Sequence, residues 1–316
     1  MYYSIIIPVY NRPGELDELL HSLACQVYTN FEVIVVDDGS TEPCKNIVER
    51  YRNKLSVRYF YKSNSGPGPS RNYGARASKG DYLIFLDSDC IAPKQYTATI
   101  EQELSENKVD LFGGADKAHD SFTNIQKAIN YSMTSALTTG GIRGNKKSID
   151  RFYPRSFNMG VEKKAFESAG GFSDMRFGED IDFSLRVLKS GSQSRLFAHS
   201  WVYHKRRTDF TKFFKQIFNS GAARINLYKR HPKSLKIVHT FPALFTAYFF
   251  VCLLTSYFLW IIAIPFFVFA ALIFIESLLK TRSVTVSFLS VYSSFVQLIA
   301  YGCGFILALF KIISPK

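Results

Sequence analysis

The nine residues Asp81-Tyr-Leu-Ile-Phe-Leu-Asp-Ser-Asp89 indicate both the fold class and the place of the chemistry. The apolar run 82–86 has the length and content of a buried β-strand, and it ends in two carboxylates, Asp87 and Asp89, on either side of Ser88. A lone carboxylate is costly to remove from water, so this pair needs solvent or a cation. Because Mg2+ and Mn2+ take carboxylate and phosphate oxygens, we interpret this strand end as a metal and diphosphate site; an ordinary turn is the alternative.

Three earlier runs, 4–9, 31–36 and 57–61, also predict buried strands, and the spacing of leucines predicts a helix over 12–26. Strand, helix and strand in this order predict an α/β fold with a mostly parallel central sheet, whose ligands bind beyond the carboxyl ends of the strands. At the carboxyl ends of the first two predicted strands, 4–9 and 31–36, lie Pro8, Val9, Tyr10, Asn11, Asp37 and Asp38. We expect them to converge on the site of Asp87 and Asp89.

The segment 64–71 contains two glycines and two prolines, so we expect a loop there, followed by a short helix over 70–77. Arg71 at the start of that helix can pair with a diphosphate, although a surface arginine is the alternative. Residues 118–150 are rich in Ser, Thr, Gly and Asn, and we expect them to form a mobile flap over the crevice.

Two later positions complete the candidate site. Glu179 and Asp180 open a predicted helix, where the helix dipole keeps a carboxylate ionised, as a general base requires. His204 ends a predicted strand over 194–204, and a neutral imidazole is a common ligand of Mn2+. The alternative is that the two acids only interact favourably with the helix dipole and that the histidine is an ordinary surface residue.

The formal charge of +13 is concentrated near the C-terminal third of the chain. Ten Lys and Arg residues lie between Trp201 and Thr240, with Asp209 as the only acid, and they alternate with apolar residues at helical spacing. This pattern predicts a basic amphipathic segment over 208–240 that lies on anionic lipid headgroups rather than on nucleic acid. Five cysteines without metal-ligand spacing are typical of thiols that are reduced and either cytosolic or buried in the membrane.

The apolar region 241–316 predicts transmembrane helices. Residues 241–279 have the length of two helices, Lys280 and Arg282 mark a cytoplasmic loop, and 284–310 predicts a third span. In the alternative with two spans, part of this region forms an interfacial or re-entrant hairpin. We therefore expect a multi-pass protein of the inner, cytoplasmic membrane, with a domain over 1–207 in the cytoplasm.

The ordered motifs resemble those of family 2 glycosyltransferases with the GT-A fold. These motifs are Pro8-Val9-Tyr10-Asn11, Asp37-Asp38-Gly39-Ser40, Arg71-Asn72-Tyr73-Gly74, Asp87-Ser88-Asp89, Asn158-Met159-Gly160 with Gly170-Gly171-Phe172, and Gly178-Glu179-Asp180. The resemblance covers about residues 3–207 and implies an inverting transfer from a nucleotide-diphosphate sugar to an acceptor hydroxyl. We expect a UDP-sugar as the donor, and the membrane anchoring favours a lipid-linked saccharide as the acceptor.

The resemblance also implies roles for single residues. Residues 8–11 with Asp37 and Asp38 would hold the nucleotide, and Asp180 would be the general base, supported by Glu179. The metal, Mn2+ or Mg2+, would be held by Asp89, Asp87 and His204, whereas Ser88, Arg71, Arg206 and Arg207 would contact the nucleotide sugar.

The chain departs from the family's processive polysaccharide synthases because no Gln-x-x-Arg-Trp follows Asp180; its tryptophans are Trp201 and Trp260. We therefore expect transfer of one sugar at a time. The alternatives are a polyprenyl-phosphate sugar synthase, whose acceptor is a lipid phosphate, and a membrane-anchored nucleotide-sugar binder without turnover.

Overall fold

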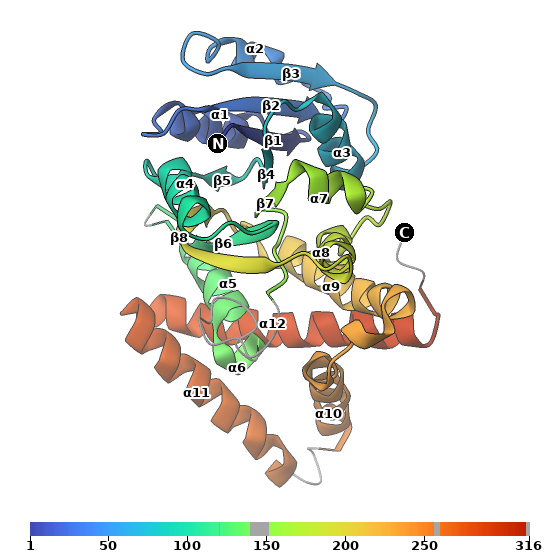
Figure 1. Cartoon of the computed structure of the whole chain (residues 1–316). Coiled ribbons are helices and arrows are strands. Elements are labelled where there is room, and N and C mark those ends of the chain that lie inside the picture. The colour runs from blue at the N-terminus through green and yellow to red at the C-terminus, as the bar shows by residue number, and fades with distance from the viewer. Residues whose placement is uncertain (120, 140–151, 256–259, 314–316) are drawn as a thin grey trace. The chain divides into compact units, whose positions relative to one another are not determined.

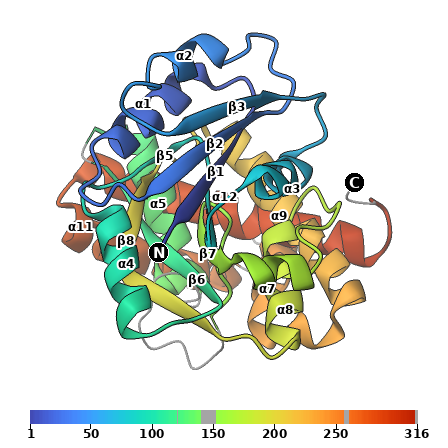
Figure 2. The same cartoon turned by 45° about the horizontal axis from the view of Figure 1, so that its top comes forward.

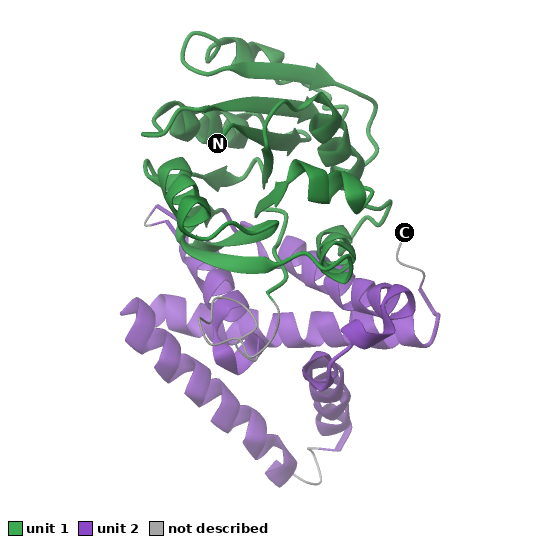
Figure 3. Cartoon of the chain, viewed as in Figure 1, with its two compact units in different colours: residues 1–117, 149–204 green, residues 118–148, 205–316 purple. Residues whose placement is uncertain are grey.

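The computed structural model describes residues 1–119, 121–139, 152–255 and 260–313 (Figure 1). The chain divides into two compact units, one made of 1–117 and 149–204 and the other of 118–148 and 205–316 (Figure 3). The first unit ends at His204, close to the predicted boundary at residue 207. The segment 118–148 groups with the C-terminal residues.

The first unit is built around one eight-stranded sheet with the order β3-β2-β1-β4-β7-β6-β8-β5 (Figure 2). The strands are β1 Tyr3–Val9, β2 Phe31–Asp37, β3 Val57–Tyr61, β4 Tyr82–Leu86, β5 Cys90–Ile91, β6 Leu111–Lys117, β7 Asn158–Glu162 and β8 Ser194–His204. Strands β1 to β4 are parallel neighbours, and β6 pairs in parallel with β8. Only β7 and β5 run against their neighbours, which confirms the predicted α/β fold with a mostly parallel sheet.

Helices and apolar cores cover both faces of this sheet. Within β1, Ile5 and Ile7 belong to one core and Ile6 to the other, as the alternation of side chains along a strand requires. The helices of this unit are α1 Pro13–Ala24, α2 Lys45–Glu49, α3 Pro67–Ala77, α4 Tyr96–Glu106, α7 Lys163–Ser168 and α8 Glu179–Lys189. The sheet therefore holds the strand ends rigidly in place.

Helix α3 begins earlier than we predicted. Pro67 and Pro69 lie in its first turn, where a backbone N–H has no acceptor within the helix. Proline, which lacks this N–H, therefore does not break the helix there. Gly66 precedes the helix with φ = 95°, a conformation that favours glycine. The predicted loop over 64–71 is therefore wrong from Pro67 onward, and Arg71 lies in the second turn rather than at the helix start.

The second unit is helical throughout the part of it that the structure describes. Its elements are α5 Asn124–Thr134, α6 Ala136–Thr139, α9 Phe210–Arg230, the 3-10 turns η1 Pro232–Ser234, η2 Ile237–His239 and η3 Trp260–Ala263, and the helices α10 Phe241–Thr255, α11 Ile264–Thr281 and α12 Val284–Leu309. The expected mobile flap is wrong for α5 and α6. The remainder of that expectation, residues 140–150, lies outside the described residues.

Three helices of this unit are long and apolar enough to cross a membrane: 237–255, 260–281 and 284–309. Helix α9 uses its apolar face differently from our prediction, because Phe213 and Ile217 are buried in a cluster with Ile129 and Ala300. The stripe that we expected to lie on lipid is therefore used largely for packing between helices. Phe214 and Tyr228 remain exposed on α9.

Candidate active site

The loops that follow β1 and β2 are tied to each other. The backbone N–H of Asn11 donates to Ser40 Oγ over 2.9 Å, and Asn11 Oδ1 accepts from the backbone N–H of Thr41 over the same distance. Asn11 has φ = 52°, which Asn tolerates better than most residues. Tyr10, just before it, is exposed. Pro8 and Val9 thus end β1, and Tyr10 and Asn11 begin the loop after it, which these hydrogen bonds brace at the carboxyl edge of the sheet.

Asp37 and Asp38 at the end of β2 are both buried. Asp37 accepts hydrogen bonds from the backbone N–H groups of Ser40 and Cys44 at 2.9 Å and from the hydroxyl of Tyr59 at 2.8 Å. Burial raises the pKa of this carboxyl, but the hydrogen bonds outweigh burial and lower its pKa below the ordinary value. Asp37 is therefore an ionised anchor of its loop.

Asp38 accepts from the N–H groups of Ser65 and Gly66 at 3.0 and 2.8 Å and pairs with Lys62. It therefore holds the loop that leads into α3. Both acids have contacts within the protein, and their predicted contacts with a nucleotide stay predictions.

Asp89 joins three segments that are distant in the sequence. It pairs through Oδ2 with Arg12 at the start of α1, and its Oδ1 lies 3.3 Å from Nε2 of His204 at the end of β8. The other ring nitrogen of His204 lies 3.8 Å from Asp116 Oδ2 on β6. These residues lie close together because β4, β6 and β8 all end at the same edge of the sheet.

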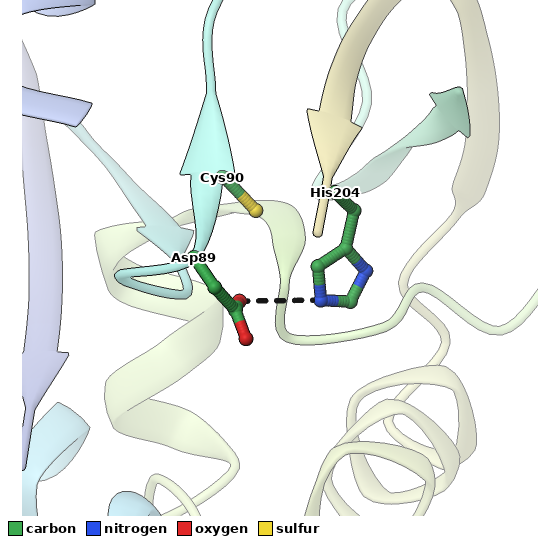
Figure 4. A group of neighbouring side chains, drawn as sticks. All are labelled: Asp89, Cys90 and His204. Atoms are coloured by element: carbon green, nitrogen blue, oxygen red, sulfur yellow. Dashed lines mark ion pairs between the residues drawn. The ribbon is translucent and has the colours of Figure 1, made fainter. Parts of the chain in front are cut away.

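The short pairing of β5 with β8 fixes the position of His204. Cys90 is the register partner of His204, and the ring of Phe157 stacks on the imidazole with a centroid distance of 4.7 Å. Figure 4 shows Asp89, Cys90 and His204 around one space, and one donor atom from each lies within 4.8 Å of the others. The imidazole is therefore fixed by backbone pairing and by ring packing.

The donor atoms of this cluster fit Mn2+. A carboxylate oxygen and a neutral imidazole nitrogen are ligands that Mn2+ accepts. The thiol of Cys90 is a poorer ligand, because it donates to the carbonyl oxygen of Phe157 over 3.5 Å and because burial raises its pKa well above the ordinary value. Asp89 and His204 are therefore the residues that would hold a cation, and Asp87 and Asp116 are the nearby carboxylates.

Arg71 lies between two acids of the candidate site and is itself only 2% exposed. Its Nη2 donates to Asp87 Oδ1 over 2.7 Å, and its Nη1 donates to Glu179 Oε1 over 2.9 Å. The aromatic ring of Phe172 lies 5.4 Å from the centre of the guanidinium. Arg71 therefore links the end of β4 to the start of α8, which we did not predict; its contact with a diphosphate stays a prediction.

The glycine motif supports this link. Gly171 has φ = 68°, and a Cβ there would lie 2.6 Å from Asn72 Oδ1. Asn72 in turn accepts from the backbone N–H of Phe172 and donates to its carbonyl oxygen, both over 2.8 Å. The motif 170–172 thus holds Phe172 against Arg71, which explains the spacing of two motifs that were noticed separately in the sequence.

The three acids at the start of α8 have different surroundings. Burial, with a smaller contribution from Asp180, raises the pKa of Glu179 to about 7. Asp180 lies 3.6 Å from Arg155 Nη1, whereas Asp182 is bound by Arg186 at 3.0 Å. Asp182 is therefore an Arg-paired acid, and Asp180 is the more accessible candidate base.

The two predicted arginines after β8 belong to the second unit. Arg206 donates to Asn130 Oδ1 from two guanidinium nitrogens at 3.2 and 3.1 Å, and Arg207 Nε donates to Gln216 over 3.2 Å. Their contact with a diphosphate stays a prediction.

Three charged residues of the site were missed in the sequence. Arg12 could have been found, because it lies just beyond the end of the predicted strand 4–9, and Asp116 lies near the end of β6. Arg155 carries no such signal.

A family model described as Glycosyl transferase family 2 matches residues 4–170 of the chain. An uncharacterized glycosyltransferase of Haemophilus influenzae is 34% identical over 197 residues, which cover 60% of this chain and 63% of that protein. Glycosyltransferase AglE of Haloferax volcanii is 28% identical over 255 residues, covering 75% and 77% of the two chains. The chain thus spans less than two thirds of the Haemophilus relative, and 22% of a Rickettsia felis relative.

Two solved structures share the fold. Mannosyltransferase PcManGT from Pyrobaculum calidifontis, solved with GDP-Man and Mn2+, has a TM-score of 0.65 at 15% identity and covers 98% of this chain and 87% of its own. Staphylococcus aureus TarS 1–349, solved with UDP-GlcNAc, has a TM-score of 0.52 at 23% identity and covers 72% and 67%. At these identities the likeness supports the fold alone.

Proposed function

This chain belongs to glycosyl transferase family 2, whose model matches residues 4–170 of its 316, and from this premise we propose that it transfers one sugar from a nucleotide-diphosphate sugar to an acceptor hydroxyl with inversion. The observation that carries the proposal is the pairing of Asp89 with His204 over 3.3 Å. A carboxylate just before β5 and an imidazole at the end of β8, which pairs with β5, are suited to hold a divalent cation beside a diphosphate.

The donor in this proposal is a UDP-sugar. Residues 8–11 and the acids Asp37 and Asp38 lie where β1 and β2 end, which is where nucleotides bind in parallel sheets. The TarS structure contains UDP-GlcNAc, whereas that of PcManGT contains GDP-Man, so a GDP-sugar is the natural competitor in any test.

The cation is Mn2+ or Mg2+, held by Asp89 and His204 with Asp87 nearby. When bound, the cation neutralises charge that develops on the leaving diphosphate. Arg12 already pairs with Asp89 and adds positive charge beside the same carboxylate. Arg206 and Arg207 are proposed to contact the diphosphate as well, and Ser88 contacts the donor between Asp87 and Asp89.

Asp180 is the proposed general base. It takes the proton of the acceptor hydroxyl while that oxygen bonds to the anomeric carbon and the bond from this carbon to the diphosphate breaks. One displacement inverts the configuration, so a single base is sufficient. Glu179 and Arg71 act as positioning residues, because the Asp87–Arg71–Glu179 chain of hydrogen bonds connects the donor side to the residue that precedes the base.

The acceptor in this proposal is a lipid-linked saccharide at the cytoplasmic face of the inner membrane. The three apolar helices of the second unit are compatible with membrane anchoring, and the basic residues between Trp201 and Thr240 favour anionic headgroups. Transfer of one sugar per acceptor is expected because the processive motif is missing from the sequence.

Purified full-length protein with Mn2+ and a panel of UDP- and GDP-sugars tests this proposal through binding of each donor and release of nucleoside diphosphate. We expect at least one UDP-sugar to bind and to be turned over when membrane lipid extract supplies the acceptor. If no nucleotide sugar binds, the proposal is wrong. If donors bind without any turnover, the non-catalytic binder takes its place.

A further inference from the structure

Helix α12 differs from α10 and α11 in its surroundings. Half of its most apolar 18-residue window is buried inside the protein, compared with 11% of the corresponding windows of the other two candidate spans. Its buried residues include many small or polar side chains: Ser287, Ser290, Ser293, Ser294, Gln297, Gly302 and Gly304. Helix α12 therefore has less surface left for lipid than α10 or α11.

Helix α9 packs tightly along the C-terminal half of α12. A Cβ on Gly304 would lie 2.0 Å from the carbonyl oxygen of Phe218, and a Cβ on Gly221 would lie 2.1 Å from that of Tyr301. Further along, Ile225 and Phe305 share a buried cluster. The two backbones therefore touch over several turns, and α9 has to accompany α12 wherever α12 lies.

Helix α9 is unsuited to the interior of a bilayer. Its cations are Lys212, Lys215, Arg224, Lys229 and Arg230, and four of these are exposed. Charged side chains in hydrocarbon are strongly unfavourable unless they pair or reach water. If α12 crossed the membrane, α9 would carry these charges into it.

A second polar helix packs on the other half of α12. Ser293 Oγ donates to the backbone carbonyl of Ala128 in α5 over 2.9 Å. Helix α5 mixes polar and apolar residues, with the sequence Asn-Ile-Gln-Lys-Ala-Ile-Asn-Tyr-Ser-Met-Thr. Helices α5 and α9, the two neighbours of α12 described so far, are thus typical of a water-soluble protein.

Helices α10 and α11 contact α12 elsewhere. Thr246 Oγ1 donates to the carbonyl of Leu298 over 3.2 Å, and Ser277 Oγ donates to Ser290 Oγ over 2.9 Å. In Figure 1, α12 runs across the view while α10 runs down it. Because the two helices run in different directions, they do not both follow the membrane normal.

The α10–α11 pair has the features of a membrane hairpin. Large apolar side chains are exposed along it, among them Leu254 at 80% and Phe267 at 73%. No Lys, Arg, Asp or Glu occurs over 237–275. Cations flank both ends, with Lys233 and Lys236 before it and Lys280 and Arg282 after it, as expected when both ends lie in the cytoplasm.

We propose that α10 and α11 alone cross the bilayer and that α12 lies along the cytoplasmic membrane surface, between this hairpin and helices α5 and α9. The partner of the α10–α11 surface is lipid, and the partner of α12 is mostly this chain itself. This replaces the third span that we predicted from apolar content alone. The chain after α12, which carries Lys311, then returns to the side from which α10 enters the membrane. The proposal rests on the membrane attachment in the proposed function but not on catalysis.

Reporter fusions to the full-length chain distinguish two spans from three. Green fluorescent protein fused after Lys316 should fluoresce, and alkaline phosphatase fused there should be inactive, because both would be cytoplasmic. An epitope tag at Met1 reports the side of the first unit, and a phosphatase inserted within 256–259 should be active in either topology. Active phosphatase after Lys316 with a cytoplasmic Met1 would overturn the proposal.

A second measurement does not depend on a fused domain. Ile312→Cys places a thiol at an exposed position just beyond α12. A membrane-impermeant maleimide should label this variant above the wild-type background only after the cells are opened. Labelling in intact cells would overturn the proposal, whether or not the protein transfers sugar.

Discussion

Nε2 of His204 lies 3.3 Å from Oδ1 of Asp89, so the end of β8 is held against the turn that follows β4. The pairing of Cys90 with His204 in the β5–β8 ladder and the stacking of Phe157 on the imidazole keep the ring there. A rigidly placed carboxylate and imidazole lose little entropy when they bind a cation. This relationship is the structural basis of the proposed metal and donor site.

Asp180→Asn should reduce the rate of sugar transfer by about 100- to 10,000-fold while donor affinity is kept, because the amide is nearly isosteric but cannot take a proton. Asp182→Asn is the matched control, since Asp182 pairs with Arg186 and that arginine also donates to the carbonyl oxygen of Gly171. Transfer rate and donor binding should be measured for both. Near wild-type transfer by Asp180→Asn would mean that the acceptor is already ionised, as in a polyprenyl-phosphate sugar synthase.

Glu179 should make the folded protein less stable as the pH rises. Its pKa is about 7 in the fold and near 4.5 ordinarily, so between these values the folded state keeps a proton that the unfolded chain releases. Stability therefore falls as the pH rises from about 4.5 to about 7, by on the order of 3 kcal/mol, since one pKa unit is about 1.4 kcal/mol.

Glu179→Gln removes this loss and keeps an acceptor for Arg71. We expect the thermal unfolding midpoint of the variant in detergent micelles, relative to wild type, to be higher at pH 8 than at pH 5. Glu106→Gln changes an exposed glutamate and should show no such difference. An equal effect of Glu179→Gln at both pH values would show that Glu179 is ionised throughout.

Gly304→Val should separate α9 from α12. The added side chain meets the carbonyl oxygen of Phe218, which belongs to a helix backbone and cannot move without its helix. Overpacking of this kind costs about 1 to 3 kcal/mol. Gly14→Ala is the control, because nothing lies within 4 Å of a Cβ there. Thermal unfolding midpoints and protease sensitivity around α9 should change only in Gly304→Val, and unchanged values would show that the two helices are not in close contact.

The strands of the first unit could be read from the sequence because each is an apolar run that ends in polar or turn residues. Val57–Tyr61, Tyr82–Leu86 and Ser194–His204 were predicted with their observed bounds. Asp89 and His204 could be assigned to one site by the rule that ligands bind at the carboxyl ends of parallel strands.

What could not be predicted depends on contacts between distant residues. The two prolines near Arg71 suggest a loop locally, but they occupy a helix start, so the burial of Arg71 between Asp87 and Glu179 was hidden. Apolar content likewise cannot tell lipid from protein as the neighbour of α12. The serines and glycines of that helix are informative only once α5 and α9 are seen to touch them.

Binding of Mn2+ and UDP to wild type and to Asp89→Ala tests the account most directly. Titration calorimetry and Mn2+ paramagnetic resonance should show that UDP binds wild type more tightly with Mn2+ than with chelator. Asp89→Ala should lose this gain while keeping the wild-type unfolding midpoint within a few degrees. Glu106→Ala should behave as wild type. Mn2+-stimulated UDP binding that persists in Asp89→Ala would contradict the assignment of this cluster as the donor site.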